Sequence, residues 1–178
     1  MADPTPALPT HPVRLADLDG RRDRTFDLMP TPAERAAVAA ALDIPKVRKL
    51  RLTGRLLPVG RKDWRLEAEL GATVVQDCVV TLEPVTTRID EAVTRSYLSE
   101  VPDLGTGEVE MPEDDEADPL PAVLDLAEVM IEALALALPP FPRAEGASLE
   151  DPDDDDDDTA DVRRPFSGLK DLLDPKDE

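Results

Sequence analysis

The sequence predicts an α+β fold built on a mainly antiparallel sheet or partly closed barrel, with two helices and disordered acidic segments. Three observations predict it. Residues 12–98 alternate repeatedly between apolar and polar side chains, the period of strands with one buried face. Two stretches, 32–42 and 126–138, follow helix-capping residues and run into prolines. Two other stretches are too acidic and proline-rich to contribute to a core.

Alternation predicts six strands, at residues 12–18, 24–28, 47–57, 64–70, 73–82 and 85–98. We expect the first two to pair as a hairpin through the turn at Asp19-Gly20. The next two should form a second hairpin with one apolar and one charged face. The fifth is nearly continuous apolar material, which is typical of a central strand.

Each predicted helix has a start signal and a stop signal. Thr31 and Glu34 can form a capping box, and Pro45 ends the helix that follows. Asp125 can cap the second helix, which should stop at Pro139.

We expect one folded domain over residues 12–142, preceded by a disordered arm at 1–11. An acidic disordered loop at about 100–119 interrupts the domain. An acidic disordered linker, 143–164, leads to a short amphipathic tail, 165–178. A folded part of roughly 120 residues is large enough for a single core.

The net charge of −20 is unevenly distributed along the chain. Residues 1–99 have a net charge of +1, whereas residues 100–160 have a net charge of −20. The total charge therefore describes the acidic segments rather than the folded surface, which is nearly neutral.

The composition favours a cytosolic protein. Cys78 is the only cysteine, so no intramolecular disulfide can form. The first ten residues do not have the pattern of a signal peptide. The longest apolar run, 123–138, is interrupted by acidic residues, so we expect no membrane association.

We expect a binding protein rather than an enzyme, with no catalytic residue, metal or cofactor. His11 is the only histidine and falls in the arm, which argues against a triad or a histidine-ligated metal. The glycines do not form a phosphate loop, and Asp153 to Asp158 lack the glycine of a calcium loop. Cys78 has apolar neighbours and should be buried and inert; the alternative is activation by a cation on an adjacent strand.

A basic cluster between residues 46 and 65 is the candidate site. It contains eight cations and a single acid, Asp63. Alternation places several on one face of a strand and others at the hairpin tip, where they could follow a phosphate backbone. The candidate RNA-binding residues are Lys49, Arg51, Arg55, Arg61 and Lys62.

An ordinary charged sheet face is the competing interpretation of this cluster. Arg51 and Arg55 could pair across the hairpin with Glu67 and Glu69. Trp64 is the only nearby aromatic residue and should face inward, so recognition by base stacking is disfavoured.

Several short segments resemble the YceD-like family, whose members are described as large ribosomal RNA subunit accumulation proteins. The similarity begins with the run Val-Gln-Asp-Cys-Val-Val-Thr-Leu-Glu-Pro-Val. Other matching segments keep the family's order along the chain: residues 54–56 upstream of this run, 124–128 running into 138–143, and 164–170. Many sequences similar to this family have a second cysteine three residues after the first. This chain has Thr81 at that position, so we do not expect a two-cysteine redox or zinc site here.

The resemblance implies a role in making or stabilising large-subunit ribosomal RNA. It supplies no catalytic residue. It also implies an association with a large-subunit ribosomal protein, L32.

Three functional hypotheses follow, of which the last, an enzyme that uses Cys78, predicts a thiol that is alkylated rapidly at neutral pH. In the first, the basic cluster binds a large-subunit ribosomal RNA precursor. In the second, the chain is an acidic holdase for a basic ribosomal protein such as L32, without direct RNA contact. Acidic runs would then imitate RNA, and an apolar stripe in the tail would dock on the partner through Phe166, Leu169 and Leu172.

Overall fold

The computed structural model describes residues 7–18, 20–100 and 117–148. Residues up to Ala147 belong to one compact unit, and a second unit begins at Ser148. Nearly all of the second unit lies outside the described residues.

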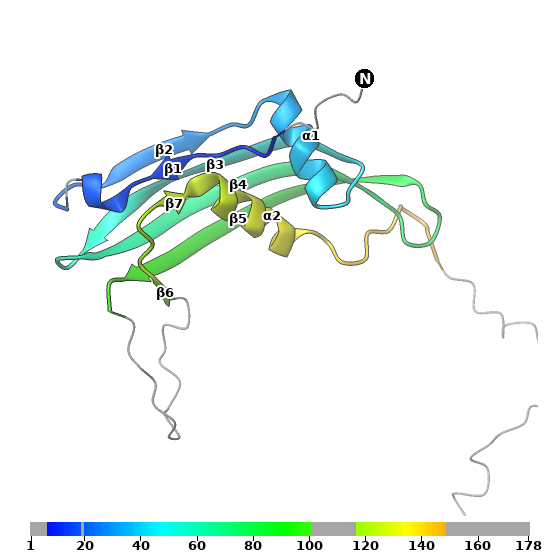
Figure 1. The fold of residues 1–178 in the computed structure, drawn as a ribbon. Helices are drawn as coiled ribbons and strands as arrows, with labels where there is room; N and C mark the ends of the chain where they lie inside the picture. Colours follow the sequence, from blue (N-terminus) through cyan, green and yellow to red (C-terminus); the bar gives the residue numbers. More distant parts are fainter. Residues whose placement is uncertain (1–6, 19, 101–116, 149–178) are drawn as a thin grey trace, which may run out of the picture. The chain divides into compact units, whose positions relative to one another are not determined.

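The first unit consists of a five-stranded sheet, a small two-stranded pairing and two helices (Figure 1). The strand order in the larger sheet is β2-β3-β4-β5-β6, and β1 pairs with β7. The elements are β1 (Pro12–Val13), a 3-10 turn (Leu15–Asp17), β2 (Arg24–Leu28), α1 (Pro32–Ala41), β3 (Lys46–Val59), β4 (Asp63–Asp77), β5 (Pro84–Leu98), β6 (Ala117–Pro119), β7 (Leu124–Asp125) and α2 (Leu126–Ala137).

Three long antiparallel strands, β3, β4 and β5, form the centre of the sheet. Their side chains alternate between the two faces, as the sequence predicts. Leu52, Leu66 and Leu70 point to one face and are almost completely buried. The apolar side of α2, including Met130 and Leu134, joins them in a single core. The opposite, outer face of the sheet carries the charged side chains of the same strands.

The α+β prediction is confirmed, and the sheet is open rather than closed into a barrel. Within the described residues, the edge strands β2 and β6 do not pair with each other. Most of the pairing is antiparallel, because hairpins connect the long strands, and only β6 runs parallel to its neighbour β5. No helix in the described residues is long and apolar enough to cross a bilayer.

Both predicted helix starts are present. The Thr31 hydroxyl accepts from the Glu34 N–H (3.3 Å), and the Glu34 carboxylate accepts from the Thr31 N–H (2.7 Å). These bonds lower the pKa of Glu34. At α2, the Asp125 carboxylate accepts from the Ala127 N–H (2.9 Å). Each carboxylate stabilises its helix by satisfying an N–H group near the helix start.

The predicted hairpin between residues 12–18 and 24–28 is wrong. β1 covers only Pro12–Val13 and pairs with β7, whereas β2 pairs with β3. The chain leaves the extended conformation in the 3-10 turn because this turn buries Leu15 in the core. Local alternation and an Asp-Gly turn gave no information about these distant partners.

The backbone of His11 is hydrogen-bonded to the start of α2, although the sequence predicted that His11 lies in a disordered arm. Its N–H donates to the Asp125 carboxylate (2.8 Å), and its carbonyl accepts from the Leu126 N–H (3.1 Å). The end of the predicted acidic loop is also structured, since β6 pairs with β5.

β4 is one continuous strand, where the sequence predicted separate strands at 64–70 and 73–82. It is the middle strand of the sheet, and it ends at Asp77. Cys78 to Leu82 instead form a turn, closed by a bond from the Leu82 N–H to the Cys78 carbonyl (3.0 Å). The apolar residues of the predicted strand 73–82 therefore belong to two structures. Those up to Asp77 are the end of β4, and those after it form a turn in which some apolar side chains are exposed.

Gly54 allows β3 and β4 to approach closely in the middle of their hairpin. It pairs with Ala68, and a Cβ atom at position 54 would lie 2.6 Å from the Ala68 Cβ and would also meet the Glu67 carbonyl. Such contacts are not tolerated without movement of the backbone. This position therefore requires glycine for space.

An ion-paired arginine connects β5, β6 and α2. Arg95 lies 2.9 Å from Glu132 of α2 and 3.8 Å from Asp118 of β6. The hydrogen bond to Glu132 is the main reason that the pKa of Arg95 is raised. These contacts help to hold α2 and the short parallel strand against β5.

Candidate nucleic-acid interface

The five predicted RNA-binding cations do not form one cluster. Lys49, Arg51 and Arg55 face the solvent along β3, whereas Arg61 and Lys62 lie in the turn that follows it. Ten residues of extended chain separate Lys49 from the end of β3 at Val59, which corresponds to roughly 33 Å. The predicted set therefore extends along most of the strand and into the turn after it.

Two of these cations are neutralised by carboxylates. Arg51 donates two hydrogen bonds to Asp27 of β2 (2.8 and 2.7 Å), and these bonds lower the pKa of Asp27. Arg55 donates to Glu67 of β4 (3.2 and 2.9 Å). The competing interpretation is thus correct for Arg55, while Arg51 pairs with a different strand from the one expected.

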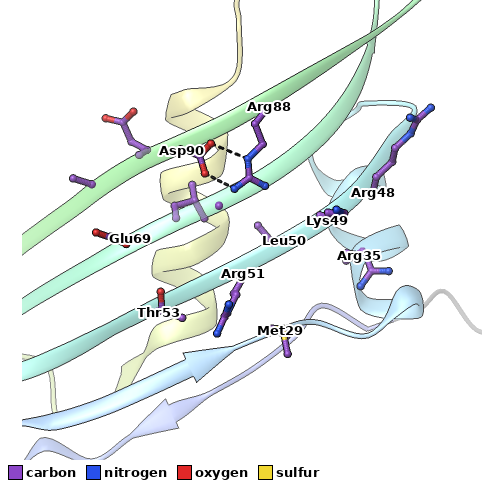
Figure 2. Close-up of a pocket in the computed structure, with 14 residues that line it drawn as sticks. Met29, Arg35, Arg48, Lys49, Leu50, Arg51, Thr53, Glu69, Arg88 and Asp90 are labelled. Atoms are coloured by element: carbon purple, nitrogen blue, oxygen red, sulfur yellow. Dashed lines mark hydrogen bonds and ion pairs between the residues drawn. The ribbon is translucent and has the colours of Figure 1, made fainter.

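A groove of about 900 Å³ lies on the outer face of the sheet, at the end where β3 begins (Figure 2). The view in Figure 2 has α2 behind the strands and the charged side chains in front. Five cations and three acids contribute to the lining. The cations are Arg35, Arg48, Lys49, Arg51 and Arg88, and the acids are Glu69, Asp90 and Glu91.

Strand register defines the floor of the groove. Lys49 of β3 is in register with Thr73 of β4, which in turn pairs with Arg88 of β5. Two strand spacings separate Lys49 and Arg88, so their backbones lie about 10 Å apart. In the next row the central position is Gly71. A Cβ atom added there would lie 2.9 Å from a guanidinium nitrogen of Arg88, so the glycine leaves room for this side chain.

A β-bulge brings an extra cation to the outer face. The register between β3 and β4 shifts between Val47 and Lys49, so Arg48 is an additional residue in β3. As a result Arg48 and Lys49 are both exposed, while Val47 and Leu50 on either side are buried. A bulge commonly redirects side chains in this way.

Sequence reasoning missed three residues of the groove as candidates: Arg35, Arg48 and Arg88. For Arg48 the signal was present, since two adjacent cations between two apolar residues break the period of two. For Arg35 and Arg88 no local signal was available, because they come from α1 and β5 and depend on tertiary packing.

The cations of the groove differ in how firmly they are neutralised. Arg88 forms an ion pair with Asp90, which raises the pKa of Arg88 and lowers that of Asp90. Arg35 donates to the Pro30 carbonyl (2.7 Å), which fixes its guanidinium without removing its charge. Within the described part of the chain, Arg48 and Lys49 form no ion pair.

This arrangement can bind anions. The groove contains no aromatic side chain on which a base could stack. In the described ranges no group of three or more His, Cys, Asp or Glu residues could hold a metal ion. The chemistry available is therefore charge-assisted hydrogen bonding from guanidinium and ammonium groups.

Cys78 is completely buried, as expected, but it lies in a turn and not in an apolar strand. Its Sγ accepts from the backbone N–H groups of Val80 and Thr81 (both 3.4 Å) and Ala144 (3.3 Å). The Thr81 side chain, followed by these N–H groups, lowers the pKa of Cys78 from 9.0 to about 6. The pKa is therefore lowered by hydrogen bonds and not by a cation on an adjacent strand, the alternative that the sequence left open.

The predicted docking residues Phe166, Leu169 and Leu172 lie outside the described residues. The same is true of the acidic run from Asp153 to Asp158.

The fold and the groove define a small α+β protein with an open sheet, one face packed on a helix and the other carrying a groove in which cations outnumber acids. A family model described as "Large ribosomal RNA subunit accumulation protein YceD" matches residues 66–173. The chain therefore belongs to the YceD family, as the sequence resemblance implied. Searches of curated proteins and of solved structures gave no match.

Proposed function

We propose that this protein supports the accumulation of large-subunit ribosomal RNA by binding a precursor RNA in the cytosol, without catalysis. The observation that carries the proposal is the groove on the outer face. Arg48 and Lys49 stand side by side there, exposed and without an ion pair in the described residues, and Arg35 adds a third fixed cation. The family's description supplies the RNA class.

The RNA bound in the groove is double-helical in this proposal. The groove offers cations from two strands and a helix but no aromatic surface, so it suits phosphates better than unstacked bases. Guanidinium groups can bind a phosphate through two parallel hydrogen bonds. Binding should accordingly depend strongly on salt and weakly on sequence.

Salt-dependent binding to a double-helical fragment of large-subunit ribosomal RNA tests this proposal. Replacing Arg48 and Lys49 with Gln should weaken binding at least fivefold and reduce the salt slope by about 1 for each lost phosphate contact. The matched control is Arg61→Gln with Lys62→Gln, which removes the same charge from the hairpin tip. It should change affinity less than twofold.

Two results would contradict the proposal. An equal loss in both double variants would show that only total charge matters. Tighter binding to the separated single strand than to the duplex would exclude recognition of helical phosphates.

A further inference from the structure

A second surface, separate from the groove, exposes three large apolar side chains. Val79, Leu82 and Phe141 are 49%, 76% and 75% exposed. The first two lie in the turn between β4 and β5, and Phe141 lies in the segment after α2. We refer to Val79, Leu82 and Phe141 as the apolar corner. None of them lines the groove.

Hydrogen bonds hold the two segments of the apolar corner together. The Val79 N–H donates to the Pro142 carbonyl (3.0 Å), and the Ala144 N–H donates to Cys78 Sγ (3.3 Å). Figure 1 shows the chain returning from α2 to the β4–β5 turn. The exposed side chains therefore belong to one bonded surface and not to separate loops.

Leu82 occupies a conformation that leucine rarely adopts. Its φ is 60°, in the left-handed region that is unfavourable for a residue with a Cβ. The side chain gains little from burial in return, because it is largely exposed. Strained residues that the surrounding structure maintains are concentrated at binding and catalytic sites. The strained and exposed leucine is therefore the residue of the corner that points most directly to a binding role.

The charges around the apolar corner are mainly negative. Asp77, Glu83 and Glu145 are exposed on the same two segments, against one cation, Arg143. In the described ranges none of these carboxylates forms an ion pair. The surface therefore repels RNA phosphates and attracts a cationic partner. A second copy of the chain would place these carboxylates against one another, which disfavours self-association at this site.

We propose that the apolar corner binds a protein segment in which an apolar side chain is flanked by lysine or arginine. The apolar side chain covers Leu82 and Phe141, and the flanking cations pair with Glu83 and Glu145. The partners to test are basic proteins that accompany large-subunit ribosomal RNA, the RNA class in the family's description. The proposal is independent of RNA binding, since the two surfaces share no residue.

Photo-crosslinking tests this proposal without RNA. The full chain carries p-benzoyl-phenylalanine in place of Phe141 and is mixed with RNA-free proteins extracted from purified large ribosomal subunits. Mass spectrometry should locate the adducts on Lys- and Arg-flanked apolar residues of basic proteins. The matched control carries the photoreactive residue in place of Leu136, which is 79% exposed on α2. Its adduct yield should be at least fivefold lower.

Two variants separate the apolar and ionic parts of the interaction. Leu82→Gly removes the side chain at a φ that glycine accepts, so the fold is retained. Glu83→Lys with Glu145→Lys reverses the charge and leaves the apolar side chains in place. Each variant should reduce the adduct yield at least fivefold.

The proposal is overturned if the yields at positions 141 and 136 are equal, or if charge reversal has no effect. Adducts with only a second copy of this chain would also overturn it. In a parallel reaction to which ribosomal RNA is added, adducts formed mainly with the RNA would overturn it as well.

Discussion

Arg51 of β3 donates two hydrogen bonds, of 2.8 and 2.7 Å, to the carboxylate of Asp27 of β2. Arg51 also lines the outer groove, whereas Asp27 does not. The ion pair therefore restrains a guanidinium that would otherwise be available to a bound phosphate. Both side chains are about half exposed, so the pair contributes little to stability.

Asp27→Asn should increase RNA affinity, by roughly twofold to fivefold at low salt, because it releases the charge of Arg51 into the groove. The salt slope should become steeper by up to about 1. Glu67→Gln is the control, since it releases Arg55, which does not line the groove. Fluorescence anisotropy at several salt concentrations measures both quantities. Equal gains in the two variants would argue against a specific groove.

Gly54→Ala should destabilise the fold by about 1–3 kcal/mol, the usual cost of overpacking. The added methyl group would lie 2.6 Å from the Ala68 Cβ, on a backbone that is fixed by pairing on both sides. Urea denaturation measures the effect. Gly20→Ala is the control, because no heavy atom lies within 4 Å of its added Cβ. A Gly54→Ala protein as stable as the control would show that the hairpin can relax.

The stability of the protein should rise with pH between about 6 and 9. The pKa of Cys78 is lowered from 9.0 to about 6 in the folded state, so the unfolded chain binds more protons in this range. The contribution is complete above pH 9 and is lost as the pH falls through 6. Urea denaturation of the native protein and of Cys78→Ala across this range should give a difference that grows with pH. A constant difference would contradict a stabilised thiolate.

Alkylation tests whether Cys78 is accessible to a reagent, which its lowered pKa alone does not determine. Its side chain is 0% exposed, so native labelling at neutral pH should be slow and limited by opening of the fold. Rapid labelling would instead favour the hypothesis of an enzyme that uses this thiol.

Leu82→Gly should stabilise the protein by up to about 1 kcal/mol. It removes the cost of a left-handed leucine, about 1–2 kcal/mol, and loses part of that gain to the greater freedom of glycine in the unfolded chain. Leu82→Ala keeps the Cβ and should bring no gain. Thermal unfolding of both variants measures the difference. Destabilisation by glycine would mean that the leucine side chain packs on the fold.

The sequence predicted those parts of the fold that depend on neighbouring residues. Alternation located most of the length of the long strands, although it divided β4 in two, and the capping box at Thr31 and the cap at Asp125 located the helix starts. It failed where a distant partner decides the outcome. β1 pairs with β7 more than 100 residues away, and the local turn signal at Asp19-Gly20 favoured a nearer partner.

The candidate site was predicted in composition but not in geometry. The cations of residues 46–65 are largely exposed, yet which of them are neutralised depends on the register of β2 and β4. Glu67 faces Arg55 directly across the hairpin and could be foreseen. Asp27 reaches Arg51 only because β2 pairs with β3, which the sequence did not indicate.

The irregularity at Arg48 also has a consequence for changes in chain length. A deletion within a strand ordinarily inverts every side chain on one side of it. Removing Arg48 would instead restore regular pairing, with Val47 and Leu50 still pointing inward. This position can therefore lose a residue, and with it one positive charge, while the hydrophobic interior stays the same.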